Sequence, residues 1–360
     1  MANRPKLKSV TVQSADGQLV IWQRALKRVF IDDAGGSLAA LLQLLTTGEH
    51  PFAALPAAMA SVGFEVTEAE IGAVVSTLDE MGLIEDADGD AALDAETRER
   101  HESNLRFYDL FSRLDRDSAS LHRSAQNARV LLLGAGGVGS GVLQSLVGLG
   151  VGEVVIVDTD VVETKNLARQ FVYGMQSVGR PKVEAAYDWA MSYSTGTRVT
   201  PVHRRITDVA SIVELGARAD VLVCAIDSPD DIHLIVNEAC FELGIPYVAG
   251  GLNYSTLSYW SVEPGRTPCR LCLDGQRNTE AASQPAILRG EPLIGRVPVN
   301  RATGPIVQLV SGFMSMEVMR YLTRTDPPVA GATYHVIELA DGMTSSTAPW
   351  PYDPACGLCT

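Results

Sequence analysis

Residues 128–182 read ARVLLLGAGGVGSGVLQSLVGLGVGEVVIVDTDVVETKNLARQFVYGMQSVGRPK, and this stretch decides the fold. Its apolar run at 128–133 predicts a buried parallel strand. The glycines that follow are Gly134, Gly136, Gly137 and Gly139. They predict a tight turn into a helix, where the backbone approaches a phosphate closely and the helix N-terminus faces the anion. Alone, this pattern predicts a nucleotide site and is most typical of dinucleotides.

Five polar residues further along the stretch narrow the choice of nucleotide. They are Asp158, Asn166, Arg169, Gln170 and Lys182. Asp158 ends the second expected strand, where a carboxylate accepts hydrogen bonds from ribose hydroxyls. A dinucleotide needs only its pyrophosphate held, largely by backbone groups, whereas two cations and an amide suit the longer polyphosphate of ATP. The alternative is an NAD-binding domain whose surface carries these charges.

Four motifs together resemble the superfamily of ubiquitin-activating enzymes (the ThiF/MoeB/HesA family). They are GAGGVGS at 134–140, DTDVVETKNLARQ at 158–170, GRPK at 179–182 and AIDS at 225–228. The resemblance covers roughly residues 95–360, and its bacterial members are the molybdopterin-synthase and thiamine-biosynthesis adenylyltransferases. It implies an enzyme, commonly a homodimer, that uses ATP and Mg²⁺ to adenylate a carboxyl group.

The resemblance also implies roles for individual residues. The implied contacts are Asp158 with the ribose, Asn166, Arg169 and Lys182 with the triphosphate, Gln170 beside them, and Asp227 with Mg²⁺. Of these, Arg169, Lys182 and Asp227 are the predicted catalytic residues. Because the attacking carboxylate is already ionised, we expect catalysis by positioning and charge neutralisation, without a side-chain base.

The six cysteines carry the second strong signal. Four form two C-x-x-C pairs, Cys269 with Cys272 and Cys356 with Cys359. Two such pairs supply four thiolates to one tetrahedral site, which has no open position and therefore predicts structural zinc. The alternative, redox or disulfide chemistry, is disfavoured in the cytoplasm. The other two, Cys224 and Cys240, are expected to be small buried residues rather than nucleophiles.

A long irregular loop, the crossover loop at about 275–298, is expected after the first cysteine pair and above the substrate carboxylate. Relatives that pass their substrate to a thioester or persulfide place a cysteine in this loop. Here it reads LDGQRNTEAASQPAILRGEPLIGR from residue 273 and contains none. The chemistry is therefore expected either to stop at an acyl-adenylate or to hand the adenylate to a nitrogen or to a partner enzyme.

Residues 1–88 are predicted to form a separate winged-helix-like α+β domain. Three short strands, with a hairpin at Asp16 and Gly17, precede three helices, the last opened by a capping box from Thr67 to Glu70. Residues 1–95 carry six basic and fourteen acidic side chains, a net charge of −8. This charge makes contacts with a phosphate backbone unfavourable, so a peptide is the better partner.

The domain resembles the precursor-recognition element at the front of enzymes that modify ribosomally made peptides. The resemblance implies that a leader peptide adds to an exposed sheet edge as a further strand. The alternative is a dimerisation or packing domain. Residues 89–127 are expected to form a linker and a helix at about 94–115. The resemblance to ubiquitin-activating enzymes implies that Arg100 or Arg106 of this helix reaches a nucleotide, in some family members that of the neighbouring subunit; the alternative is that both are solvated surface residues.

Residues 128–360 are predicted to form the ATP-binding domain. Strands are expected near 128–133, 153–158, 198–203, 220–225 and 246–250, and helices near 138–149, 181–193, 208–216 and 230–243. This alternation predicts a Rossmann-like, doubly wound, mainly parallel sheet. Later segments predict an antiparallel extension, a long helix from about 303 and the zinc knuckles.

Composition limits the partners. The chain has 29 basic and 43 acidic residues and a net charge of −14, which argues against nonspecific nucleic-acid binding. It has no apolar run of membrane-spanning length and no signal sequence, which predicts a cytoplasmic protein with no membrane partner. We therefore expect adenylation of a carboxyl group on a ribosomally made precursor peptide. The alternatives are adenylation of a Gly-Gly sulfur carrier and a noncatalytic scaffold that delivers a leader peptide to a cyclodehydratase.

Overall fold

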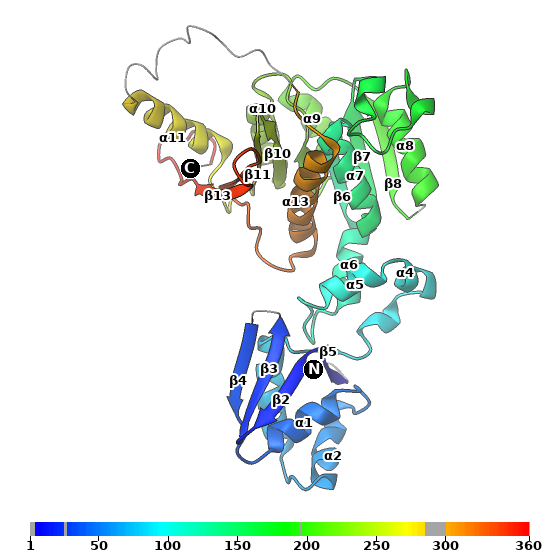
Figure 1. Ribbon diagram of the computed structural model, residues 1–360, viewed down its shortest axis with the longest axis vertical. Coiled ribbons are helices and arrows are strands. Elements are labelled where there is room, and N and C mark those ends of the chain that lie inside the picture. Colours follow the sequence, from blue (N-terminus) through cyan, green and yellow to red (C-terminus); the bar gives the residue numbers. More distant parts are fainter. Residues whose placement is uncertain (1–3, 25–26, 195, 285–299, 360) are drawn as a thin grey trace. The chain divides into compact units, whose positions relative to one another are not determined.

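The computed structural model describes residues 4–24, 27–194, 196–284 and 300–359. The chain divides into two compact units, Met1–Arg123 and Ser124–Thr360, and Figure 1 shows the elements of each. Each unit buries its own apolar core, and we therefore describe the two units separately. The finer division of the chain at residues 88 and 127 stays a prediction.

The first unit begins with small antiparallel sheets. One contains β2 (Thr11–Ala15), β3 (Gln18–Arg24) and β4 (Lys27–Asp32), and the other contains β1 (Pro5–Leu7) and β5 (Ile84–Asp86). Asp16 and Gly17 connect β2 to β3 with φ values of 52° and 77°, the two positive angles of a type I′ turn. The predicted hairpin is therefore confirmed. The pairing of β1 with β5 is not visible in the sequence pattern.

Three helices follow these strands. They are α1 (Ser37–Leu45), α2 (Leu55–Ser61), which a short 3₁₀ turn at Phe52–Ala54 precedes, and α3 (Glu68–Glu80). The backbone N–H of Glu70 donates to the Thr67 hydroxyl at 3.2 Å, and the N–H of Thr67 donates to the Glu70 carboxylate at 2.8 Å. This confirms the capping box that begins α3. Apolar faces of the three helices pack with Leu19 and Ile21 of β3.

The helix predicted at 94–115 is wrong as a single element. Two short helices occupy its place, α4 (Ala95–Arg100) and α5 (Glu102–Tyr108). His101 separates them with φ −106° and ψ 18°, outside the helical region, so the backbone hydrogen-bond pattern is interrupted there. The next helix, α6 (Ser118–Asn127), leads into the second unit.

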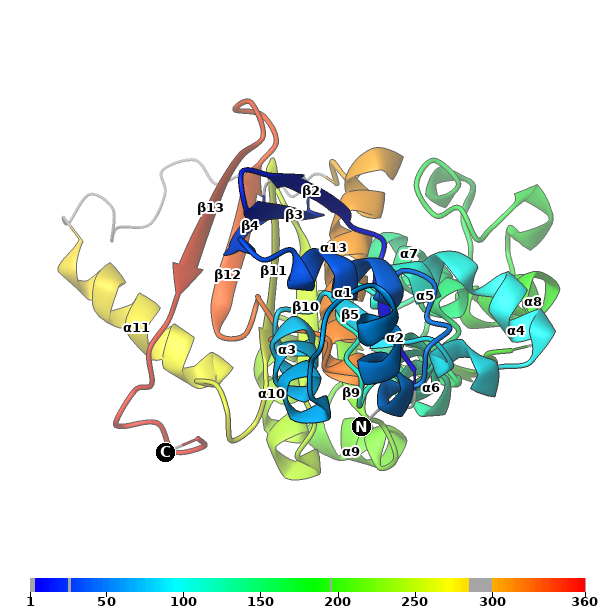
Figure 2. The same ribbon diagram turned by 90° about the horizontal axis from the view of Figure 1, so that it is seen from below.

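The second unit is built on an eight-stranded sheet in the order β13-β12-β11-β10-β9-β6-β7-β8. Its parallel strands are β6 (Arg129–Leu133), β7 (Glu153–Asp158), β8 (Arg198–His203), β9 (Val221–Cys224) and β10 (Tyr247–Asn253). Its antiparallel strands are β11 (Thr256–Val262), β12 (Thr333–Glu338) and β13 (Thr344–Pro349). The predicted parallel sheet with an antiparallel extension is confirmed. Figure 2 shows that extension, including β13, whose polar sequence TSSTAP does not predict a strand.

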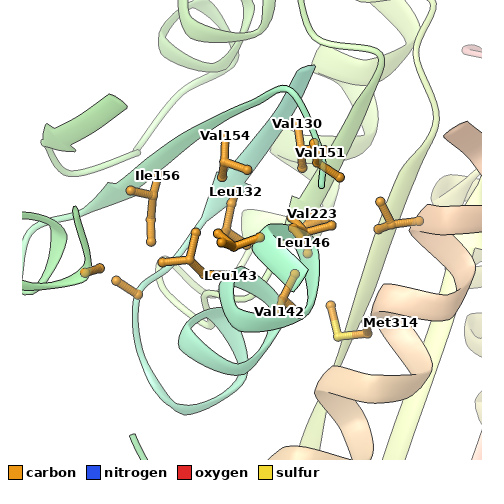
Figure 3. Close-up of a cluster of buried hydrophobic side chains, with 14 of the residues drawn as sticks. Val130, Leu132, Val142, Leu143, Leu146, Val151, Val154, Ile156, Val223 and Met314 are labelled. Carbon is orange, nitrogen blue, oxygen red and sulfur yellow. The ribbon is translucent and has the colours of Figure 1, made fainter. Parts of the chain in front are cut away.

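Helices cover both faces of this sheet. One face carries α7 (Gly137–Leu149), α8 (Lys182–Tyr193) and α13 (Gly304–Thr323); the other carries α9 (Val209–Gly216) and α10 (Ile232–Leu243). Figure 3 shows how Leu143 and Leu146 of α7 and Met314 of α13 meet the valines and leucines of the strands. In the part of the chain that the structure describes, no helix has the length and apolarity needed to cross a membrane.

The crossover loop predicted at about 275–298 is wrong at its start, because α11 (Arg270–Ser283) continues through that segment. Side-chain pairs one helical turn apart stabilise α11, since Arg270 donates to Asp274 at 3.0 Å and Gln276 donates to Glu280 at 2.8 Å. The rest of the predicted loop, at 285–299, lies outside the described residues.

A buried carboxylate fastens α13 to the sheet. Glu317 is 0% exposed, and its oxygens accept hydrogen bonds from the Ser261 hydroxyl at 3.0 Å and the backbone N–H of Ala330 at 2.8 Å. The Arg320 guanidinium lies 3.3 Å away and supplies the opposite charge. A charge buried this deeply is tolerated because each oxygen has partners.

We predict that Glu317→Leu lowers the melting temperature of the second unit by roughly 5–10 °C, because removing one side of a buried pair costs about 3 kcal/mol and leaves several donors unsatisfied. Tryptophan fluorescence reports on this unit, which holds Trp189, Trp260 and Trp350. Met316→Leu, at a partly exposed position on the same helix, is the matched control. Equal melting temperatures for the two variants would show that the Glu317 contacts do not stabilise the unit.

Candidate functional site

The glycine turn lies at the carboxyl end of β6, the strand whose neighbours β7 and β9 stand on opposite sides of it. In a doubly wound sheet this switch point is where ligands bind. Gly134 has φ 105°, and a Cβ atom there would lie 2.5 Å from the Ala225 carbonyl oxygen. A Cβ atom on Gly139 would overlap the carbonyl of Gly134. Only glycines therefore allow the turn to touch both the loop after β9 and the first turn of α7.

Two side chains hold the backbone of this turn at Ala135. The Ala135 N–H donates to Asp158 Oδ2 at 2.7 Å, and the Tyr173 hydroxyl donates to the Ala135 carbonyl at 2.7 Å. Burial raises the pKa of Tyr173 well above its usual value, and the charges of Asp158 and Asp160 add to the effect, so the hydroxyl keeps its proton and donates. Tyr173 is not among the site residues predicted from the sequence, although it lies only three residues after Gln170.

Asp158 stands where the sequence predicts it, at the end of β7 beside the turn. Its Oδ2 holds Ala135 and its Oδ1 accepts the backbone N–H of Asp160 at 2.8 Å. A carboxylate oxygen has a second acceptor site, so the two backbone bonds fix the orientation of the group without exhausting it. The arrangement leaves Asp158 able to accept hydrogen bonds from hydroxyl groups of a ligand.

Asn166, Arg169 and Gln170 form a compact turn around the 3₁₀ segment Thr164–Asn166. Asn166 is buried, and its Oδ1 accepts the backbone N–H of Glu163 at 2.9 Å. Arg169 extends toward the glycine turn, since its Nε lies 3.8 Å from the position of a Cβ on Gly137. Gln170 is also buried, and its Oε1 has no hydrogen-bond partner among the described residues. The structure thus brings Arg169 to the glycine turn, whereas the side chains of Asn166 and Gln170 are buried.

Lys182 begins α8 and is buried, with 6% of its surface exposed. Its Nζ lies 2.7 Å from Asp160 Oδ2, and its backbone N–H donates to the Asp160 carbonyl at 2.9 Å. A buried ammonium needs such a partner because desolvation disfavours the charge. Asp160 is missing from the predicted site, although its spacing of two residues from Asp158 in DTD is a signal that could have identified it.

Asp227 is exposed in the loop after β9, and Ala225 of this loop contacts the glycine turn. The neighbouring Cys224 is buried, its thiol donates to the Ile226 carbonyl at 3.7 Å, and burial raises its pKa to about 12. Burial also raises the pKa of Cys240. Both cysteines are buried, as predicted, and burial favours the protonated thiol over the thiolate that a nucleophile requires.

The two C-x-x-C pairs meet at one point of the second unit. The sulfur atoms of Cys269 and Cys356 lie 3.4 Å apart, those of Cys272 and Cys359 lie 3.3 Å apart, and all four lie within 4.8 Å of one another. Zinc–sulfur bonds of about 2.3 Å in a tetrahedron place sulfurs about 3.8 Å apart. The four thiols are not joined as disulfides. Their number, chemistry and spacing fit a closed zinc site.

The two arginines predicted to reach a nucleotide, Arg100 and Arg106, belong to the first unit. Arg100 ends α4, and Arg106 Nη1 lies 3.4 Å from Asp109 Oδ2 on the exposed side of α5. Their role at a nucleotide stays a prediction.

Comparison with curated proteins finds relatives that match about two thirds of the chain. The chain is 33% identical over 236 residues to the SAMP-activating enzyme E1 of Haloferax volcanii, covering 65% of this chain and 80% of that protein. It is 27% identical over 243 residues to the molybdopterin-synthase adenylyltransferase of Salmonella typhimurium, covering 65% and 88% of the two chains.

Comparison with solved structures finds a likeness along nearly the whole chain. The crystal structure of E. coli MccB with ATP superposes with a TM-score of 0.75 at 18% identity, over 99% of this chain and 100% of that one. The microcin C7 biosynthetic enzyme MccB in complex with N-formylated MccA has a TM-score of 0.74. At this identity the likeness establishes the fold. The ThiF family model matches residues 111–358, so the chain belongs to the ThiF family and is an enzyme of the adenylyltransferase type.

Proposed function

We propose that this enzyme adenylates a carboxyl group on a ribosomally made precursor peptide, using ATP and Mg²⁺ and releasing pyrophosphate, without a cysteine thioester. The observation that carries the proposal is an apolar groove on the first unit, beside an edge strand, in a chain whose second unit is of the ThiF type. A groove of this kind suits a peptide in extended conformation.

The groove lies between β4 and the helices α1 and α3 and has a volume of about 290 Å³. Its lining residues are Ile31, Leu38, Ala73, Val74, Thr77, Leu78 and Met81. Within the described part of the chain, β4 pairs only with β3, so its other edge offers backbone donors and acceptors. A leader peptide that paired with this edge would direct alternate side chains into the groove.

The likeness to MccB supports the same reading. The sequence relatives match 65% of the chain, whereas the MccB structures match 99%, which includes the first unit. One of those structures holds the precursor peptide MccA. The combination of an adenylation unit and this first unit is therefore shared with an enzyme that binds a peptide.

The residues of the second unit fit the proposed chemistry. The glycine turn and the N-terminus of α7 would hold the phosphates, Asp158 would hold the ribose, and Arg169 and Lys182 would offset the charge of the triphosphate. Asp227 would bind Mg²⁺, which takes one or two carboxylates together with substrate phosphates and neutralises their developing charge.

The proposed reaction needs no side-chain base, because the attacking carboxylate is already ionised. A carboxylate oxygen of the peptide forms a bond to the α-phosphorus, the bond from that phosphorus to the bridging oxygen breaks, and its electron pair leaves with pyrophosphate. The crossover loop expected at about 275–298 contains no cysteine, and none occurs between residues 273 and 355, so the product is the acyl-adenylate. Arg169 and Lys182 act by position and charge, and Tyr173 keeps the turn in place.

Adenylation of a Gly-Gly carrier protein is the second candidate. It is favoured by the sequence relatives, because the SAMP-activating enzyme and the molybdopterin-synthase adenylyltransferase match this chain at higher identity than MccB does. The longer match to MccB, over 99% of this chain against 65% for those relatives, favours the peptide.

The decisive experiment measures ATP–pyrophosphate exchange with two probes, any short peptide that is encoded beside the gene and a carrier protein ending in Gly-Gly. We expect exchange with the peptide. Asp227→Asn should lower it by about two to three orders of magnitude, because a ligand of the charge-neutralising metal is lost. Peptide binding should stay within twofold of wild type.

Asp230→Asn is the matched control, since Asp230 is exposed in the same loop. It should keep wild-type exchange. Exchange with the carrier alone would establish the second candidate, and exchange with neither probe would refute adenylation of both.

Ala73→Glu should weaken binding of the same peptide by roughly tenfold or more, because it places a charge in the apolar groove. Fluorescence anisotropy of the labelled peptide measures this effect. Ser76→Glu, an exposed position on the same helix outside the groove, should bind normally. Equal affinities for the two variants would remove the groove from the proposal.

Chelation of zinc, or Cys356→Ser, should lower the melting temperature of the second unit by roughly 5–10 °C, because the metal ties the end of the chain to α11. Metal analysis should find about one zinc ion per wild-type chain. Cys240→Ala should keep the metal, since this cysteine lies outside the cluster. Wild-type protein that is free of zinc and equally stable would exclude a structural metal.

A further inference from the structure

The hairpin between β10 and β11 carries an aromatic residue in a backbone conformation that favours glycine. Asn253 pairs with Thr256, so Tyr254 and Ser255 form a two-residue turn. Tyr254 has φ 60° and Ser255 has no positive φ, which is the pattern of a type II′ turn, where glycine normally occupies the first central position. A tyrosine there is strained, and strained residues concentrate at functional sites.

Neighbouring contacts hold the hairpin in this conformation. The Thr256 hydroxyl donates to Glu338 at 2.8 Å, and the backbone N–H of Leu339 donates to the Ser255 carbonyl at 2.9 Å. The Tyr254 ring itself is 48% exposed, so burial in the core does not explain why a large aromatic residue stands at this position.

The exposed ring lies against a cation. The Arg301 guanidinium lies 4.2 Å from the centre of the Tyr254 ring, within the range of a cation–π contact. A stacked guanidinium uses its face for the ring, whereas its N–H donors lie in its plane and match the fork of a carboxylate. Tyr254 therefore fixes the plane of a group whose donors suit an anion.

The pair stands at the carboxyl end of the parallel strands. Ala249 of β10 lies beside Cys224 of β9, and β10 continues for four residues beyond this level, about 13 Å, before the turn begins. Asp227 follows Cys224 by three residues at the same edge. The tip of the hairpin therefore extends beyond the carboxyl ends of the parallel strands, the same edge of the sheet at which the glycine turn lies.

Arg301 lies three residues before the start of α13. The helix starts at Gly304, and Val307 in its first turn lies 3.1 Å from the position of a Cβ on Gly137. Arg301 thus leads directly into the helix that packs on the glycine turn. The Tyr254–Arg301 contact connects the β10–β11 hairpin to the segment that leads into α13.

We infer that Arg301 binds the carboxylate that is to be adenylated and that Tyr254 is the positioning residue that orients Arg301. The inference rests on the proposed function and adds a substrate-side group to it. A carboxylate and a polyphosphate repel each other, so a cation on the carboxylate side of the turn lowers the barrier to their approach.

ATP–pyrophosphate exchange tests this role through the separate KM values of the two substrates. With the peptide encoded beside the gene, Arg301→Gln should raise the KM for the peptide about tenfold or more, as loss of a charge-assisted hydrogen bond does, while the KM for ATP stays within twofold. Tyr254→Gly should raise the peptide KM several-fold, although glycine suits the turn and should leave the melting temperature equal or higher.

Two matched controls separate this role from a structural one. Met343→Gly relieves a positive φ of 57° at another exposed hairpin residue, and Arg266→Gln removes an exposed arginine at the far end of β11. Both should keep the wild-type KM for the peptide. Unchanged peptide KM values for Arg301→Gln and Tyr254→Gly in an active enzyme would overturn the inference alone. A wild-type chain that exchanges with neither the peptide nor the Gly-Gly carrier would overturn the proposed function, and the inference with it.

Discussion

The second unit depends on the close approach of backbone to backbone between β6 and α7. Because a side chain at Gly139 would overlap the carbonyl of Gly134, the helix can start directly under the turn only with glycine there. The same approach sets the position of α13, since Gly141 of α7 faces the Ser311 side chain and the Ser311 hydroxyl donates to the Val138 carbonyl at 2.9 Å. The positions of the glycine turn, of α7 and of α13 therefore depend on the glycines of α7, where the backbone is approached closely.

Much of this was predictable because the determinants are local in sequence. The apolar strands, the glycine turn, the Asp16–Gly17 hairpin and the Thr67 capping box each have a short, chemically specific pattern. The four-cysteine cluster was predictable because thiolates have few other reasons to occur as two C-x-x-C pairs. In each case the residues of a short segment, by their own chemistry, determine the local structure.

The features that the sequence did not predict depend on partners far away in the chain. The strand β13 begins with four polar residues, Thr344 to Thr347, and forms because β12 offers it an edge. The single helix expected at 94–115 is broken at His101, whose side chain is buried within the first unit. Tyr173 and Asp160 act through Ala135 and Lys182, and these pairings appear only once the loops after β6 and β7 are placed side by side.

The pairing of Lys182 with Asp160 has a consequence for selectivity by charge. Any anion that reaches this ammonium meets a carboxylate already in place 2.7 Å away, so the anion gains only what it offers beyond a single negative charge. A ligand with one charge has little advantage over Asp160, whereas a chain of phosphates can satisfy Lys182 and still interact with other cations. In the proposed site, the ion pair would therefore favour a polyphosphate, which reaches several cations at once, over an anion that contacts Lys182 alone.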